Sequence, residues 1–112
     1  MITALTALLG NRTASKVLLY IAVNRDGYAQ EIADRIGVSL NLVQSQLKRL
    51  ERGGVLVSRP RGRMRFFSFN PRFPLADSLR QLLQQALDFL PDEEREQYLV
   101  RRRPRAPAKR IG

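Results

Sequence analysis

The sequence predicts a mainly α-helical domain with one small β-hairpin. Apolar residues recur at the spacing of an α-helix in several segments between residues 2 and 90. Two β-favourable runs, VLVSR at 55–59 and RFFSF at 65–69, flank the turn sequence PRGR. Because the chain has 112 residues, it is long enough for one domain with a single modest core.

The first two predicted helices are apolar on one side. Residues 2–9 form a short helix, and the segment NRTASKVLLYIAVN at 11–24 forms a longer one. Asn11 or Thr13 can cap the longer helix, because a side-chain oxygen of either can accept a hydrogen bond from the first turn. The sequence RDG ends this helix. The apolar side of the first helix carries Ile2, Leu5, Leu8 and Leu9, and the predicted inward residues of the second are Val17, Leu18, Ile21 and Ala22.

Two further predicted helices, 29–36 and 39–52, are joined by the segment GVS. Gly37 supplies a tight turn, and Ser39 is the predicted N-cap of the second helix. A glycine pair ends that helix. Two helices at this spacing predict a helix-turn-helix, whose second helix enters the major groove of DNA. The inward residues are Ile32, Ala33 and Ile36, then Leu40, Val43, Leu47 and Leu50.

The outward face of the 39–52 helix carries groups that can bind DNA. At 100° per residue, this face collects Asn41, Ser45, Lys48 and Arg52, with Gln44 and Arg49 at its flanks. Amide and hydroxyl groups can bond base edges, and lysine and arginine can bind phosphate or guanine. A polar face is equally typical of a surface helix that is merely solvated, so this face alone does not decide the function.

The predicted hairpin follows this helix as a wing. The glycine of PRGR can adopt φ > 0, so the tip is expected to present Arg61 and Arg63 to the phosphate backbone or the adjacent minor groove. Phe67 and Phe69 share one strand face and are expected to pack on the core; a stacking platform for single-stranded bases is the less favoured interpretation. Strand alternation places Arg65 on the Phe67 side, which makes it a weaker candidate than the two tip arginines.

The segment PLADSLRQLLQQALDFL at 74–90 predicts a last long helix with a wide apolar stripe. Part of this stripe is expected to pair with a second subunit, with residues 2–9 contributing, so that two recognition helices face major grooves about 34–36 Å apart. Residues 101–112 hold six basic residues and no acid. The predicted organisation is a winged helix-turn-helix domain at 1–73, a C-terminal helical segment for dimerisation at 74–100, and a disordered basic tail at 101–112.

The composition excludes several functional classes. Twenty Lys and Arg against ten Asp and Glu give a net charge of +10, which attracts polyanions. The chain has no cysteine and no histidine, so disulfides, thiolate or imidazole metal sites and a histidine base are excluded. Glu31, Asp34 and the acidic run at 92–96 have no nucleophile or phosphate loop near them in sequence, and we expect no enzyme, no metal and no cofactor. Without a membrane span or a signal peptide, a cytoplasmic protein with no membrane partner is expected.

The segment YAQEIADRIGVSLNLVQSQLKRLERGGVLVSRPRGRMRFFSFNP resembles the winged helix-turn-helix core of ArsR-like and MarR-like bacterial and archaeal transcriptional regulators. The motifs that match are EIADRIGVS, VQSQLKRLERGGVL and the basic hairpin that closes with FNP, and the similarity extends over residues 11–75. It implies that a homodimer binds duplex DNA, with the 39–52 helix in the major groove and the hairpin at 55–69 as the wing. Metal-sensing ArsR-like proteins use cysteine or histidine ligands, so a metal-responsive mechanism is excluded here.

We therefore predict sequence-specific binding of double-stranded DNA by a prokaryotic-type transcriptional regulator. The alternative is a winged-helix module that binds protein or RNA and has no specific operator. The predicted DNA-binding residues are Ser39, Asn41, Gln44, Ser45, Lys48, Arg49, Arg61 and Arg63.

Overall fold

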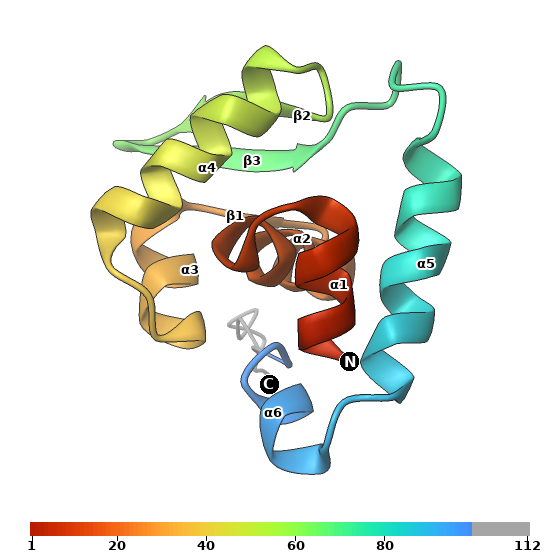
Figure 1. Ribbon diagram of the computed structural model, residues 1–112. Helices are drawn as coiled ribbons and strands as arrows, with labels where there is room; N and C mark the ends of the chain where they lie inside the picture. Colours follow the sequence, from red (N-terminus) through yellow and green to blue (C-terminus); the bar gives the residue numbers. More distant parts are fainter. Residues whose placement is uncertain (100–112) are drawn as a thin grey trace, which may run out of the picture.

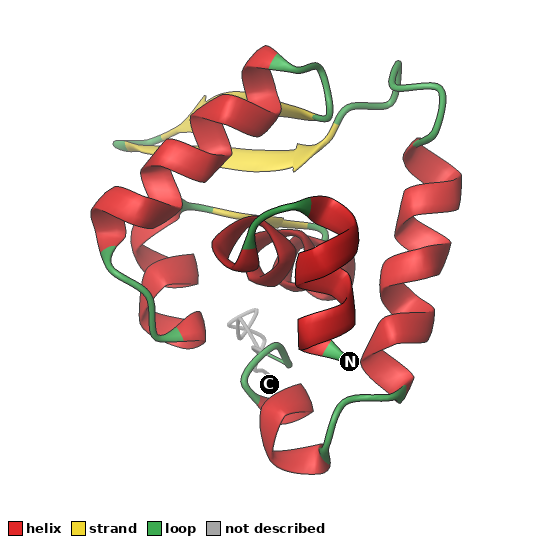
Figure 2. Ribbon diagram, in the orientation of Figure 1, coloured by secondary structure: helices red, strands yellow, loops and turns green. Residues whose placement is uncertain are grey.

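The computed structural model of the chain describes residues 1–99, so the predicted tail at 101–112 lies outside the described residues (Figures 1 and 2). The helices of this part are α1 (Ile2–Leu9), α2 (Arg12–Asn24), α3 (Ala29–Ile36), α4 (Leu40–Arg52), α5 (Ala76–Asp88) and α6 (Asp92–Glu96). The strands are β1 (Asp26–Gly27), β2 (Leu56–Arg61) and β3 (Met64–Phe69).

Helix α2 forms the centre of the domain. Figure 1 shows α1 in front of it, α3 and α4 on one side and α5 on the other. Of the two predicted caps, Asn11 is the N-cap, because its Oδ1 accepts a hydrogen bond of 2.8 Å from the Ala14 N–H. The predicted inward residues of α2 are buried, and Leu19 and Tyr20 on its other faces are buried as well. The helix is therefore packed on every side, which a single apolar stripe does not predict.

The helix-turn-helix forms as its local signals predict. Gly37 takes the left-handed conformation with φ of 70°, and the Ser39 Oγ accepts a hydrogen bond of 3.4 Å from the Leu42 N–H. Beyond α4, the left-handed residue is Gly54 (φ 82°), while Gly53 remains near helical geometry. The buried residues of the two helices are Ile32, Ala33, Ile36, Val43 and Leu47.

The three strands form an antiparallel sheet in the order β1-β3-β2. Strand β2 continues through Pro60 and Arg61, and Arg61 pairs with Met64, so the turn is shorter than the predicted PRGR. Strand β1 was not expected from the sequence, and its Gly27 pairs with Phe67. A Cβ at Gly27 would lie 2.7 Å from the Cε1 atom of Tyr20, and only glycine fits between this strand and α2.

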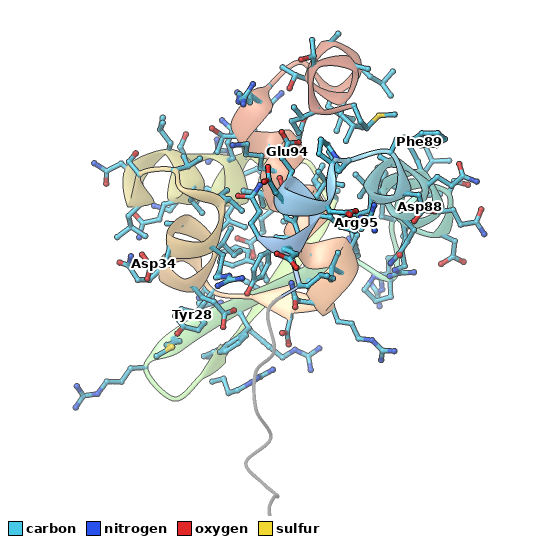
Figure 3. All side chains as sticks on the ribbon, turned by 90° about the horizontal axis from the view of Figure 1, so that it is seen from below. Tyr28, Asp34, Asp88, Phe89, Glu94 and Arg95 are labelled. Carbon is cyan, nitrogen blue, oxygen red and sulfur yellow. The ribbon has the colours of Figure 1, made fainter. Side chains whose placement is uncertain are left out.

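The C-terminal segment returns to the core. Leucines of α5 pack toward α2, and α6 then crosses below α1 and α3 (Figures 1 and 3). Tyr98, which follows α6, is only 1% exposed. Its backbone carbonyl accepts a hydrogen bond of 2.8 Å from the Asn24 Nδ2, and the Gln97 carbonyl accepts one of 3.3 Å from the Arg35 Nε. Residues 74–99 thus share one core with the preceding helices.

The burial of Tyr98 is expected to make the folded domain less stable at alkaline pH. Burial first, and the Glu94 carboxylate second, raise the pKa of the Tyr98 hydroxyl above its ordinary value. The unfolded chain therefore loses this proton first, and the stabilising effect, complete below pH 10, is lost as the pH rises. We expect this group to lower the free energy of unfolding above pH 10 by up to about 1 kcal/mol per pH unit. Urea titrations of the wild type and of Tyr98→Phe at several pH values above 10 measure this dependence. If the free energy of unfolding fell equally with pH in both proteins, the Tyr98 hydroxyl would not be its cause.

Candidate nucleic-acid interface

The outward face of α4 is exposed along its length. Val43 and Leu47 hold the helix against the core, and this orientation turns the opposite side to solvent. All six predicted residues on or beside this helix are exposed: Ser39, Asn41, Gln44, Ser45, Lys48 and Arg49. Two of them have local partners, since the Ser39 hydroxyl caps α4 and the Arg49 Nη1 donates a hydrogen bond of 2.9 Å to the Gln46 Oε1.

Leu42 is an apolar residue on the exposed side of α4 that sequence reasoning left out. Its side chain is 54% exposed in the first turn of the helix. Leu42 lies outside the apolar stripe of the helix, and a leucine at such a position could have been predicted from the sequence to be exposed. In a major groove, an apolar group at the start of a recognition helix can contact a thymine methyl group.

Arg61 does not project from the tip of the wing as predicted. Its Nη2 lies 3.0 Å from the Asp26 Oδ2, and its guanidinium carbon lies 3.9 Å from the centroid of the Phe66 ring. The Tyr28 ring meets Phe66 edge-on at a centroid distance of 5.2 Å. Because Arg61 is the last residue of β2 and shares a sheet face with Asp26 and Phe66, its side chain folds back over that face. Arg61 therefore ties the wing to β1, although its side chain stays 58% exposed.

Arg65 lies on the opposite face of the wing, toward α4. Its Nη1 donates a hydrogen bond of 3.1 Å to the Ser58 Oγ, and this hydroxyl donates one of 2.5 Å to the Glu51 Oε2 at the end of α4. The hydrogen bonds fix the wing relative to the helix. Arg65 is exposed even though it shares a strand face with the buried Phe67. Strand alternation therefore predicted the correct face for Arg65, and the structure adds that the side chain is exposed there.

The wing and α4 enclose a cleft of about 300 Å³. Gln44, Lys48 and Arg65 line this cleft, and Leu47 and Phe67 are among its apolar residues. No acidic residue lines it. The structure thus places Gln44, Lys48 and Arg65 around one cleft. Arg61 is separated from all three, because it lies on the other face of the sheet. Arg63 is exposed in the turn, and its side chain makes no hydrogen bond or ion pair with any residue from 1 to 99.

No group of three or more acidic side chains within residues 1–99 is placed to hold a metal ion. None of the helices between Ile2 and Glu96 is long and apolar enough to cross a membrane. The acidic run at 92–96 forms α6, on which Figure 3 labels Glu94 and Arg95. Asp92 pairs with Arg95 at 3.3 Å, one turn along the same helix.

A second exposed surface is an apolar groove between α1 and α5. Phe89 at the end of α5 is 71% exposed and lies at the outer edge of the molecule (Figure 3), and Leu8 on α1 is 66% exposed. Exposed apolar groups gathered in one groove, rather than scattered singly, mark a contact surface. The groove has no charged side chain and is lined by Met1, Ala4, Leu5, Leu8, Leu82, Gln85, Ala86 and Phe89.

Comparison with known proteins agrees with this architecture. Residues 11–57 match a family model described as a winged helix-turn-helix DNA-binding domain. Among solved structures, the apo form of a ZitR mutant from Lactococcus lactis is similar, with a TM-score of 0.54 and 18% sequence identity. The similarity covers 84% of this chain and 80% of that chain and, at this identity, concerns the fold. A search of curated proteins found no match. The predicted fold class, a mainly α winged helix-turn-helix domain followed by a C-terminal helix, is confirmed.

Proposed function

We propose that this winged helix-turn-helix chain is a prokaryotic-type transcriptional regulator, ArsR-like or MarR-like, that binds a specific sequence of double-stranded DNA as a homodimer in the cytoplasm. The observation that carries the proposal is the cleft between α4 and the wing, which Gln44, Lys48 and Arg65 line and which no acidic residue lines. A major groove admits an α-helix, and its base edges present donors and acceptors that amides and cations can bond. Helix α4 is the element that we place in the groove.

The proposed base contacts lie in the first half of α4 and along its exposed side. Asn41 and Gln44 carry amides that can bond adenine at two positions, and Lys48 can bond guanine. These side chains are exposed on a helix whose position is fixed by buried residues on its other face. Such contacts supply discrimination between sequences, whereas phosphate contacts position the protein.

The wing supplies the proposed phosphate contacts. Arg65 lies beside Gln44 and Lys48 in the cleft, and Arg63 lies in the turn of the hairpin. The hydrogen bonds from Arg65 through Ser58 to Glu51 hold the wing at a fixed position relative to α4. A DNA phosphate backbone that passes between the wing and α4 would therefore meet arginine side chains that are already held in position.

The apolar groove between α1 and α5 is the proposed dimer interface. A twofold dimer uses the same patch on both subunits, and this patch is mostly apolar with no charged side chain, as the core of such an interface is. Helices α4 and α5 lie on opposite sides of α2, so pairing through α5 leaves the α4 surface of each subunit free (Figure 1). Two α4 helices related by a twofold axis would read a palindromic site.

Alanine at Gln44 or at Lys48 is expected to weaken binding to the cognate duplex by about 1–3 kcal/mol and binding to random duplex by less. The reason is that a base contact contributes only where the matching base is present. Fluorescence anisotropy with both duplexes measures the difference. Gln81→Ala, on the exposed side of α5, is the matched control. Equal losses on the two duplexes would show that these side chains do not read bases.

The wing arginines are expected to differ in their effect on salt dependence. Arg63→Gln and Arg65→Gln should each reduce the slope of log K against log salt by about 0.9, because each removes one phosphate contact. Arg61→Gln should leave the slope nearly unchanged, since Arg61 is already bound to Asp26 and Phe66. Binding isotherms at several salt concentrations give the slopes. A larger change for Arg61 than for Arg65 would reverse the assignment.

A further inference from the structure

The sheet has an outer face, on the side away from the core. Residues that pair directly across antiparallel strands project from the same face. Leu56, Phe67 and Phe69 project from the inner face and are buried. The outer face carries Asp26 of β1, Val57, Arg59 and Arg61 of β2, and Met64, Phe66 and Ser68 of β3. Its central residues, Arg59, Arg61 and Phe66, line neither the cleft beside α4 nor the apolar groove.

Arg61 and Phe66 form a stacked pair on this outer face. The guanidinium carbon of Arg61 lies 3.9 Å from the centroid of the Phe66 ring, which is a cation–π distance. The Asp26 Oδ2 accepts a hydrogen bond of 3.0 Å from the Arg61 Nη2, and the Tyr28 ring supports Phe66 edge-on. The Arg61 side chain nevertheless stays 58% exposed. The side of the guanidinium that faces away from the ring is therefore open to solvent.

A guanidinium held in this way can serve as a platform for a nucleobase. Unpaired bases stack on aromatic rings and on guanidinium planes, and every base has a face that can do so. An exposed arginine loses rotamer freedom when it binds a ligand, and this loss weakens binding. Asp26 and Phe66 already restrict the Arg61 side chain, so that a base would meet a group that is held in position.

Arg59 adds an unpaired positive charge beside this platform. It is exposed, it lies directly opposite Phe66, and it is two residues, about 7 Å, from Arg61 along β2. Its side chain makes no hydrogen bond or ion pair with any residue from 1 to 99. Asp26 is the only acidic residue that β1, β2 and β3 contribute to this face, and Arg61 pairs with it. The outer face is therefore complementary in charge to a phosphate chain.

These groups suit a single strand better than a duplex or a protein. The bases of a duplex are stacked on one another, so a duplex would offer this face its phosphates but no free base to stack on Arg61. A stable protein interface buries about 800 Å² of each partner around an apolar core. Val57 and Phe66 are partly buried and Met64 lies beside the turn of the hairpin, so the outer face has no such core.

We propose that the outer face of the sheet binds single-stranded nucleic acid, with a base stacked on the Arg61 guanidinium and the neighbouring phosphate bound by Arg59. This site lies on the opposite face of the sheet from the cleft in which Gln44 and Lys48 are proposed to read duplex DNA. The two binding activities rest on different residues, so a failure of one can be told from a failure of the other.

The test compares a fluorescein-labelled oligothymidylate of about twelve nucleotides with an abasic strand of the same length, which keeps the phosphates and lacks the bases. Fluorescence anisotropy with the full chain should show oligothymidylate bound at least about tenfold more tightly than the abasic strand. Arg61→Lys keeps the charge but loses the planar group, so it should remove most of this preference. Phe66→Leu, which removes the supporting ring, should have the same effect.

The contribution of Arg59 is measured by salt dependence. Arg59→Gln should reduce the slope of log K against log salt for oligothymidylate by about 0.7, because one phosphate contact to a single strand is lost. Arg72→Gln removes an exposed arginine outside this face and is the matched control, with an unchanged slope. Circular dichroism of each variant separates loss of binding from loss of structure.

Equal affinity for oligothymidylate and the abasic strand would overturn the proposal, because binding would then depend on charge alone. An unchanged preference in Arg61→Lys would overturn it as well. Loss of the preference in Gln44→Ala would place the strand in the cleft beside α4 and would contradict the assignment to the outer face. An oligouridylate of the same length distinguishes the two kinds of strand, since a tighter complex with it would identify RNA as the partner.

Discussion

Phe89→Glu is expected to produce a folded monomer whose affinity for a palindromic operator is at least about a hundredfold lower than that of the wild type. Phe89 is 71% exposed, so the change costs the isolated domain little. In a twofold dimer the change occurs on both subunits and places two negative charges in an apolar interface that has no charged side chain. Each monomer would then bind one half-site without the gain that a linked second site supplies.

Light scattering measures the mass, which should fall to the 12.8 kDa of one chain, and a gel-shift titration measures the affinity for the operator. Leu99→Glu is the matched control, because Leu99 is also exposed and lies outside the groove. A Phe89→Glu variant that remains a dimer would show that the groove between α1 and α5 is not the interface.

Tyr98→Ala is expected to lower the free energy of unfolding by about 3–5 kcal/mol, as removal of a fully buried aromatic ring does. Tyr98 is 1% exposed and belongs to the same core as α2 and α5. A loss of this size is a large share of the 5–15 kcal/mol that typically stabilises a domain. It would also release the segment whose carbonyl groups bind Asn24 and Arg35.

Urea denaturation followed by far-ultraviolet circular dichroism measures this loss at neutral pH. Tyr98→Phe keeps the ring and is the control, since it should cost much less than the alanine change. A loss below about 1 kcal/mol for Tyr98→Ala would mean that the segment after α6 contributes little to the core. In that case, the domain would be complete without residues 92–99.

The elements that could be predicted from the sequence are those with strong local signals. Gly37 marks the end of α3 and Ser39 the start of α4, and the apolar stripe that includes Val43 and Leu47 determines which side of α4 is buried. Strand β1 has two residues, too few to show a period, and it depends on tertiary contacts, since it pairs with β3 where a Cβ at Gly27 would approach Tyr20 of α2. The burial of Tyr98 depends on a reversal of the chain after α5. The sequence around Tyr98 is mostly acidic and has no apolar pattern that would predict this reversal.

The candidate site shows the same limit. The exposed face of α4 follows from helical periodicity, and its predicted residues are indeed exposed. Arg61 is 35 residues from Asp26 in sequence, and their pairing depends on the register of β1 against β3, which alternation within the hairpin does not reveal. Alternation gave the correct face for Arg65. It could not show that this face opens into a cleft beside α4, where an arginine stays exposed.

The measurement that tests the central claim most directly is selection from a randomised duplex library with the purified protein at near-physiological salt, followed by sequencing. Sequence-specific binding by a twofold dimer predicts an enriched palindrome whose half-sites are one helical turn apart, about 10 base pairs. Retention of duplex without enrichment of any sequence would contradict the claim. It would leave a charge-driven binder of nucleic acid or a winged-helix module that binds protein or RNA.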